Sequence, residues 1–92
     1  MKKTLQIMVK GRVQGVGYRW FARQVARELG VKGFVRNLPN GDVEVVAQGE
    51  EEVLNLLIRE LNRGPAFAHV VDMEIKELDL PPDRYHSFEV AF

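Results

Sequence analysis

The sequence contains no cysteine among its 92 residues. This absence excludes disulfide bonds, thiolate nucleophiles and metal sites with cysteine ligands. Histidine is also scarce, because only His69 and His86 are present and their separation matches no common ligand spacing. We therefore expect no bound metal and no cofactor, so that any chemistry must come from other polar groups.

The chain also lacks an excess of charge and a long hydrophobic run. Lys plus Arg and Asp plus Glu each number 13, whereas nucleic-acid-binding proteins usually carry a basic excess. No apolar run approaches the length of a transmembrane helix. Basic residues at the N-terminus precede an alternating pattern instead of the apolar block of a signal peptide. We expect a cytoplasmic protein that binds neither nucleic acid nor a membrane.

The hydrophobic pattern predicts one domain over residues 1–92. Two segments have the period of an amphipathic helix, 18–29 and 50–61. Period-two or short β-prone segments predict the strands 3–10, 32–37, 42–48 and 69–78, and a short last strand carries Phe88, Val90 and Phe92. This order predicts an α+β, ferredoxin-like βαββαβ sandwich. Its antiparallel sheet has two helices on one face and a short extra C-terminal strand.

The same pattern gives expectations for single side chains. In the strand 69–78, the alternation predicts that Val71, Met73 and Ile75 face the core. Trp20 precedes polar positions of the first helix, so we expect it to be partly exposed. Phe92 alternates with small or polar residues, which indicates packing in the core or at a sheet edge.

A glycine loop, Gly11–Gly17, joins the first predicted strand to the first predicted helix. The first amides of a helix have no partner within it, and a glycine-rich loop directs further N–H groups at one anion. Arg19 adds a planar set of donors that suits a phosphate. The loop lacks the Gly-Lys-Ser/Thr ending of nucleotide-binding loops, so a single phosphoryl group is the expected ligand. The alternative is that the glycines only form a tight turn.

Asn37 ends the second predicted strand. A strand–helix–strand crossover leaves the first two strands parallel, so that their carboxyl ends reach the same edge of the sheet. Asn37 is therefore expected to approach the glycine loop. The alternative is that its side chain caps the turn formed by the following Pro39 and Asn40-Gly41.

Two segments resemble the signatures of the acylphosphatase family. GRVQGVGYRWF (Gly11–Phe21) is similar to the phosphate-loop signature, and GFVRNLPNGDVE (Gly33–Glu44) is similar to the second signature. Gly64-Pro65, with Ala68 and Val70, matches a later pattern of the family. One departure is Asp42, which stands where many members carry Ser or Thr. Another is Tyr18 in place of the commoner Phe, and we expect its hydroxyl to reach solvent.

The resemblance implies a role for each matching residue. Arg19 would be the catalytic arginine that binds phosphate, and Asn37 would position the attacking water. Backbone amides would come from the loop residues Gln14, Gly15, Val16, Gly17 and Tyr18.

The implied activity is metal-independent hydrolysis of an acyl phosphate to a carboxylate and inorganic phosphate, with phosphate as product and inhibitor. Nothing in the sequence requires more than a monomer. Because the sequence ends directly after the last predicted strand, we expect a free-standing enzyme.

Two rival functions remain open at this stage. One is a non-catalytic module that binds phosphoryl groups or other anions. The other, less favoured, is an RNA-binding domain of the same strand order, which would stack bases on sheet aromatics. The outward positions of the first and third strands carry no aromatic residue; they are Thr4, Gln6, Met8, Lys10, Glu44, Val46 and Gln48.

Overall fold

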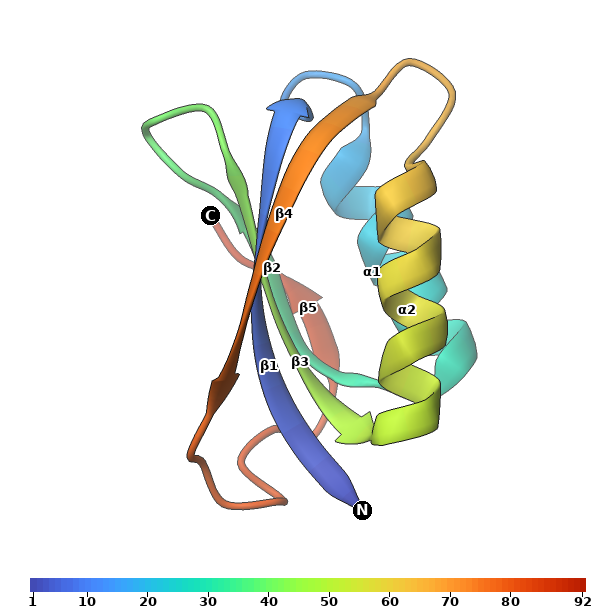
Figure 1. The fold of residues 1–92 in the computed structure, drawn as a ribbon, viewed down its shortest axis with the longest axis vertical. Helices are drawn as coiled ribbons and strands as arrows, with labels where there is room; N and C mark the ends of the chain where they lie inside the picture. Colours follow the sequence, from blue (N-terminus) through green and yellow to red (C-terminus); the bar gives the residue numbers. More distant parts are fainter.

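The computed structural model describes residues 1–92, and it contains five strands and two helices (Figure 1). In chain order the elements are β1 (Lys2–Arg12), α1 (Tyr18–Leu29), β2 (Lys32–Asn37), β3 (Val43–Glu50), α2 (Glu51–Arg63), β4 (His69–Leu78) and β5 (Phe88–Val90). The predicted order of elements is therefore confirmed. Strand β1 is longer than predicted and includes the first residues of the glycine loop.

The five strands form one sheet in the order β4-β1-β3-β2-β5. The first four pair antiparallel, as predicted, whereas β5 pairs parallel with β2 and makes the sheet mixed. Both helices cover the same face of this sheet (Figure 1). Because β3 lies between β1 and β2, the carboxyl ends of β1 and β2 reach the same end of the molecule.

The core lies between the helices and the sheet. Each helix buries one row of side chains: Tyr18, Ala22 and Ala26 from α1, and Leu54, Leu57 and Leu61 from α2. These side chains pack on the apolar residues of the covered face, including Ile7, Val9, Val35, Val45 and Ala47. Neither helix is both long and apolar enough to cross a lipid bilayer.

The prediction for β4 was wrong at two of three positions. Met73 packs against the core, but Val71 is 70% exposed and Ile75 is 47% exposed. The register between β1 and β4 shifts at Lys10/Gly11, so that Val71 is an unpaired extra residue. Gly11 permits this close pairing, since a Cβ there would lie 2.2 Å from the carbonyl oxygen of His69. Further along, β4 is an outer strand that the helices cover poorly, which leaves Ile75 exposed.

Candidate active site

The glycine loop lies between the end of β1 and the start of α1. Gly15 and Gly17 have positive φ angles, 74° and 78°, which side-chain-bearing residues rarely adopt. Gly17 is the N-cap of α1, and no side chain caps this helix end. None of the backbone N–H groups from Gln14 to Tyr18 donates a hydrogen bond to an acceptor of the protein. The loop thus presents a set of free donors at the positive end of the helix dipole.

Arg19 lies in the first turn of α1, beside these free amides. It takes part in none of the ion pairs of the protein, so its guanidinium remains available to an anion. Its Cζ atom lies 4.9 Å from the centre of the Phe92 ring, in a cation–π contact. The expectation of a packed Phe92 was wrong, since the residue is 96% exposed. The neighbouring Trp20 is 57% exposed, as predicted.

Asn37 is the last residue of β2, at the end of the sheet where β1 leads into the glycine loop. Its side-chain oxygen Oδ1 is buried and has no hydrogen-bond partner in the protein. A buried acceptor without a partner is rare, because the lost hydration costs about 1–3 kcal/mol. Asn37, the residue to which the family resemblance assigns the attacking water, therefore has an acceptor oxygen without a partner in the protein.

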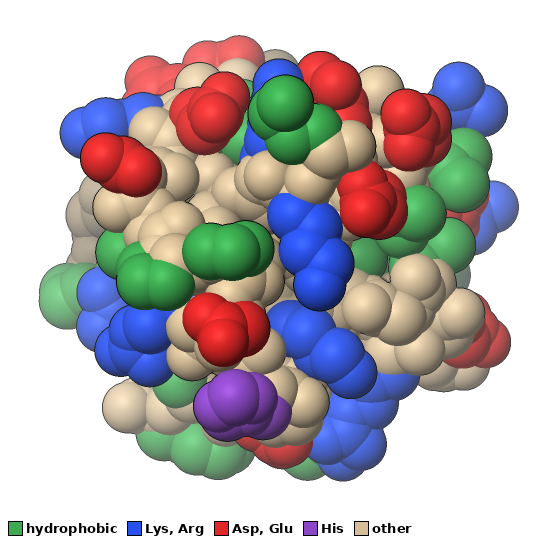
Figure 2. All heavy atoms as spheres, turned by 90° about the horizontal axis from the view of Figure 1, so that it is seen from below, with side chains coloured by type: hydrophobic (Ala, Val, Ile, Leu, Met, Phe, Trp, Pro, Cys, Tyr) green, Lys and Arg blue, Asp and Glu red, His purple; other side chains and the backbone are tan.

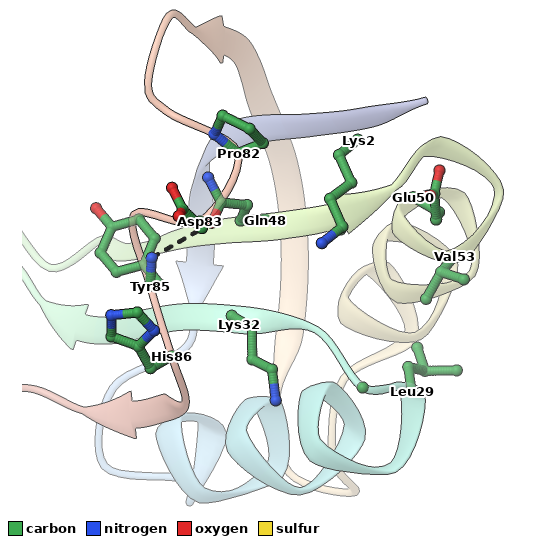
Figure 3. Close-up of a pocket in the computed structure, with 12 residues that line it drawn as sticks. Lys2, Leu29, Lys32, Gln48, Glu50, Val53, Pro82, Asp83, Tyr85 and His86 are labelled. Atoms are coloured by element: carbon green, nitrogen blue, oxygen red, sulfur yellow. Dashed lines mark hydrogen bonds between the residues drawn. The ribbon is translucent and has the colours of Figure 1, made fainter.

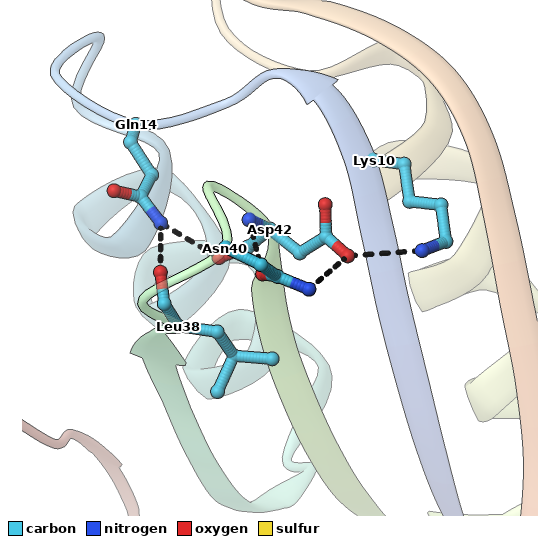
Figure 4. A network of polar contacts seen from close by, with 5 residues as sticks. All are labelled: Lys10, Gln14, Leu38, Asn40 and Asp42. Atoms are coloured by element: carbon cyan, nitrogen blue, oxygen red, sulfur yellow. Dashed lines mark hydrogen bonds and ion pairs between the residues drawn. The ribbon is translucent and has the colours of Figure 1, made fainter.

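The side chain of Gln14 joins the glycine loop to the β2–β3 turn (residues 38–42), as Figure 4 shows. Its Nε2 donates to the carbonyl oxygen of Leu38 and to that of Asp42, each at 2.8 Å. This contact confirms that the loop and the end of β2 lie close together. Sequence reasoning had assigned Gln14 only a backbone amide, and it missed the side chain.

Asp42 is held within the same network. Its Oδ2 accepts from Lys10 Nζ at 3.0 Å and from Asn40 Nδ2 at 3.2 Å, while its own backbone N–H donates to Asn40 Oδ1 at 3.0 Å (Figure 4). The hydrogen bond and charge of Asp42 hold the pKa of Lys10 above its ordinary value of 10.5. The carboxylate of the turn is therefore already paired with a lysine.

Tyr18 does not reach solvent, which corrects the sequence-based expectation. It is buried, and its hydroxyl donates to the carbonyl oxygen of Leu61 at 2.6 Å. Within α2 this carbonyl would accept from the residue four positions later, but that residue is Pro65, which has no N–H. Burial also raises the pKa of the Tyr18 phenol above its ordinary value of 10.0. Pro65 is a signal in the sequence that the Leu61 carbonyl needs a donor from outside α2, but it does not identify Tyr18 as that donor.

A cavity of about 330 Å³ lies at the opposite end of the sheet, between the C-terminal ends of α1 and β3 (Figure 3). Its lining includes Lys2, Lys32, Asp83 and His86, together with Gln48. Figure 2 shows this end of the molecule, where basic side chains lie among acidic ones. The cavity contains none of the predicted site residues, and we place the candidate active site at the glycine loop. No group of three or more His, Cys, Asp or Glu side chains is arranged to hold a metal ion.

Comparison with known proteins agrees with the fold and with the family resemblance of the sequence. The family model for acylphosphatase matches residues 5–90. The acylphosphatase of Archaeoglobus fulgidus is 49% identical over 89 residues, which cover 97% of this chain and 98% of the relative. That of Thermus thermophilus is 53% identical over 72 residues, or 78% and 82% of the two chains.

A solved structure gives the same result. The crystal structure of acylphosphatase from Bacillus subtilis superposes with a TM-score of 0.93 and 33% identity, over 100% of both chains. The fold, the two sequence signatures and the match to the family all agree. The chain therefore belongs to the acylphosphatase family and is a hydrolase that acts on acyl phosphates.

Proposed function

We propose that this chain cleaves acyl phosphates by direct attack of water on a phosphoryl group bound at the glycine loop. The observation that carries the proposal is the row of free N–H groups from Gln14 to Tyr18, beside an unpaired Arg19. The Gln14 contacts bring the β2–β3 turn, which follows Asn37 directly, to this loop. Donors for a phosphoryl group and an acceptor for a water molecule thus lie at the same end of the sheet.

The free amides and Arg19 bind the three non-bridging oxygens of the phosphoryl group. Phosphoryl transfer depends mainly on in-line positioning and on stabilisation of the charge on these oxygens. Backbone amides at a helix start are fixed before the substrate arrives, so they need no reorganisation during the reaction. The guanidinium adds a full positive charge in planar geometry. Together these groups stabilise the transition state more than the bound substrate.

Asn37 positions the attacking water. One O–H of the water donates to Asn37 Oδ1, the buried oxygen that has no partner within the protein. This contact directs a lone pair of the water toward phosphorus and away from the leaving group. Part of the rate then comes from the fixed in-line geometry, because an oriented reactant no longer loses this freedom in the transition state.

The leaving group explains why no protein acid is needed. The P–O bond to the acyl group breaks, and its electron pair leaves on a carboxylate, which is a weak base. The attacking water forms the new P–O bond, and its proton passes to a non-bridging phosphoryl oxygen. The products are a carboxylate and inorganic phosphate, and phosphate competes with substrate for the same donors. No side chain of Asp, Glu or His has to act, and the nearby Asp42 is paired with Lys10.

The first experiment is the hydrolysis of benzoyl phosphate by the wild type and by Asn37→Ala, with a metal chelator present and phosphate tested as inhibitor. We expect chelator-resistant turnover that phosphate inhibits and that falls by about 10²–10³-fold in the variant. Asn55→Ala is the matched control, since Asn55 is exposed on α2. It should leave turnover and phosphate inhibition unchanged.

Two outcomes would contradict the proposal. If the wild type bound phosphate without hydrolysing benzoyl phosphate, the chain would be an anion-binding module that retains the loop. If Asn37→Ala kept full turnover, the water would be positioned by another group.

A monomer in solution is the expected oligomeric state, and sedimentation of the active sample measures it.

A further inference from the structure

We infer that the side chain of Gln14 is a positioning residue that holds Asn37 at a fixed distance from the phosphoryl site. This inference rests on the proposed function, because it concerns the distance between the bound phosphoryl group and the attacking water. The backbone amide of Gln14 belongs to the row of free donors. Its side chain, which extends in the other direction to the β2–β3 turn, makes a separate contribution (Figure 4).

The sheet does not extend far enough to fix this turn. The last paired residues are Val9 with Val43 between β1 and β3, and Asn37 with Val43 between β2 and β3. Beyond these pairs, β1 stays in the sheet as far as Arg12 only through its pairing with β4, and the glycine loop and the turn share no backbone ladder. Contacts made by side chains must therefore set their separation.

The turn closes without help from Gln14. The Leu38 N–H donates to the Asp42 carbonyl at 2.9 Å, and the Gly41 N–H donates to the Leu38 carbonyl at 3.1 Å. Gln14 uses the second acceptor position of each of these two carbonyls. Its amide is thus not required to form the turn. What it adds is a link from the closed turn to the loop, at the residue directly after Asn37.

A second contact, an ion pair, also links β1 to the turn. Lys10, on β1 directly before the loop, pairs with Asp42 at 3.0 Å. An ion pair with partly exposed members contributes little and weakens with salt, and its long side chains allow several geometries. The planar amide of Gln14 makes two hydrogen bonds at once, so it restricts the separation more strongly than the ion pair does.

The consequence for the reaction is a selective effect on rate. Misplacement of a reacting group by about 1 Å can cost about 10²-fold in rate, while the binding of the phosphoryl group depends on the loop amides and Arg19 and not on Asn37. Loss of the Gln14 side-chain contacts should therefore lower kcat and leave phosphate binding intact. Loss of a residue that shapes the loop would change both quantities.

The test is Gln14→Met, which keeps the length of the side chain and the backbone amide but removes both side-chain donors. We expect kcat for benzoyl phosphate to fall about 10–100-fold, with KM and the phosphate inhibition constant within about threefold of the wild type. The matched control is Gln24→Met on the exposed side of α1, which should behave as the wild type. An unchanged kcat in Gln14→Met would overturn the inference. An equal loss of phosphate inhibition would also overturn it, because the side chain would then shape the loop itself.

A double variant separates positioning from general destabilisation. If Gln14 acts through Asn37, then Gln14→Met should cost less than about twofold in kcat when Asn37 is already alanine. The same 10–100-fold loss in both backgrounds would show that Gln14 acts independently of Asn37 and would contradict the inference.

Amide hydrogen exchange gives a readout that does not depend on activity. In Gln14→Met the hydrogen-bonded amides of the turn, those of Leu38, Gly41 and Asp42, should exchange faster than in the wild type, while those of α2 stay unchanged. If the wild type failed to hydrolyse benzoyl phosphate, the proposed function would fail, but faster exchange would still support the link. Unchanged exchange in the turn would refute the link whatever the activity.

Discussion

Key polar groups at the two ends of the sheet differ in whether they have partners within the protein. At the end with the cavity, Gln48 uses its whole amide inside the protein: Nε2 donates to Thr4 and to the Pro81 carbonyl, and Oε1 accepts from the Tyr85 N–H. The N-terminal amine likewise pairs with Glu50 at 2.8 Å. At the other end, five consecutive backbone N–H groups, the Arg19 guanidinium and Asn37 Oδ1 have no such partner.

Under the proposed function, this difference separates groups that stabilise the fold from groups that bind a ligand. At the cavity end, the hydrogen bonds of Gln48 hold the connection between β4 and β5 against the sheet. An unpaired group at the loop end does not stabilise the fold, and in the proposed function it binds an anion or a water. A substitution at the loop end should therefore change the activity, whereas a substitution at the cavity end should change the free energy of unfolding.

The largest expected effect is on activity at the loop end. Arg19→Ala should lower kcat/KM for benzoyl phosphate about 10²–10³-fold, which corresponds to about 3–4 kcal/mol, and should weaken phosphate inhibition. The unfolding free energy should stay close to that of the wild type, since Arg19 makes no ion pair. Steady-state kinetics and urea unfolding measure the two quantities.

The control for Arg19→Ala is Arg23→Ala, which removes an arginine stacked on Trp20 one turn further along α1. Normal activity is expected for this control. Full turnover with unchanged phosphate inhibition in Arg19→Ala would show that the guanidinium does not contact the substrate.

The next effect is on stability at the cavity end. Gln48→Leu should lower the unfolding free energy by about 1–3 kcal/mol, because the buried Thr4 hydroxyl and the part-buried Tyr85 N–H lose their hydrogen-bond partner. The turnover of benzoyl phosphate should be that of the wild type. Urea unfolding checks the first statement, with Gln24→Leu as the exposed control. A large loss of kcat in a folded Gln48→Leu variant would contradict the idea that the cavity end affects stability without affecting activity.

Tyr18 has one polar group of each kind, because its backbone N–H has no partner within the protein whereas its hydroxyl is hydrogen-bonded. Tyr18→Phe should lower the unfolding free energy by about 1 kcal/mol at pH 7, because the Leu61 carbonyl loses its donor. Burial raises the pKa of the folded phenol, so its contribution is complete below about pH 10 and decreases as the pH rises further.

The pH dependence distinguishes this phenol from other groups. Above pH 10, Tyr18 should make the wild type lose up to about 1.4 kcal/mol of stability per pH unit, and Tyr18→Phe should lack this part of the slope. Urea unfolding from pH 8 to pH 11 gives both curves. Parallel curves would mean that the phenol ionises equally in the folded and unfolded chains.

The smallest effect concerns the aromatic contact of Arg19. Phe92→Ala should reduce kcat/KM by less than about fivefold, because an exposed cation–π contact is worth about 0.5–1 kcal/mol. Steady-state kinetics with benzoyl phosphate measure it, and Phe92→Leu separates the loss of the ring from the loss of bulk. A reduction as large as that of Arg19→Ala would indicate that Phe92 itself contacts the substrate and does not act only through Arg19.

Much of the site could be predicted from local pattern and topology. Glycine spacing identified the loop, and the crossover rule placed Asn37 at the same end of the sheet. The Gln14 link was missed because its partners are two carbonyls 24 and 28 residues away, and the turn geometry alone brings them within reach. Val71 was misplaced because one bulge reverses the alternation on which its burial was predicted.

The bulge at Val71 also bears on self-association. Strand β4 is a long outer strand, and its free backbone groups would allow another chain to add to the sheet. The extra residue breaks the regular row of donors and acceptors near one end, and Asp72, Glu74, Lys76 and Glu77 place charge along the rest. The opposite outer strand, β5, has only three residues. The irregularity that exposes Val71 thus protects the sheet from edge-to-edge aggregation.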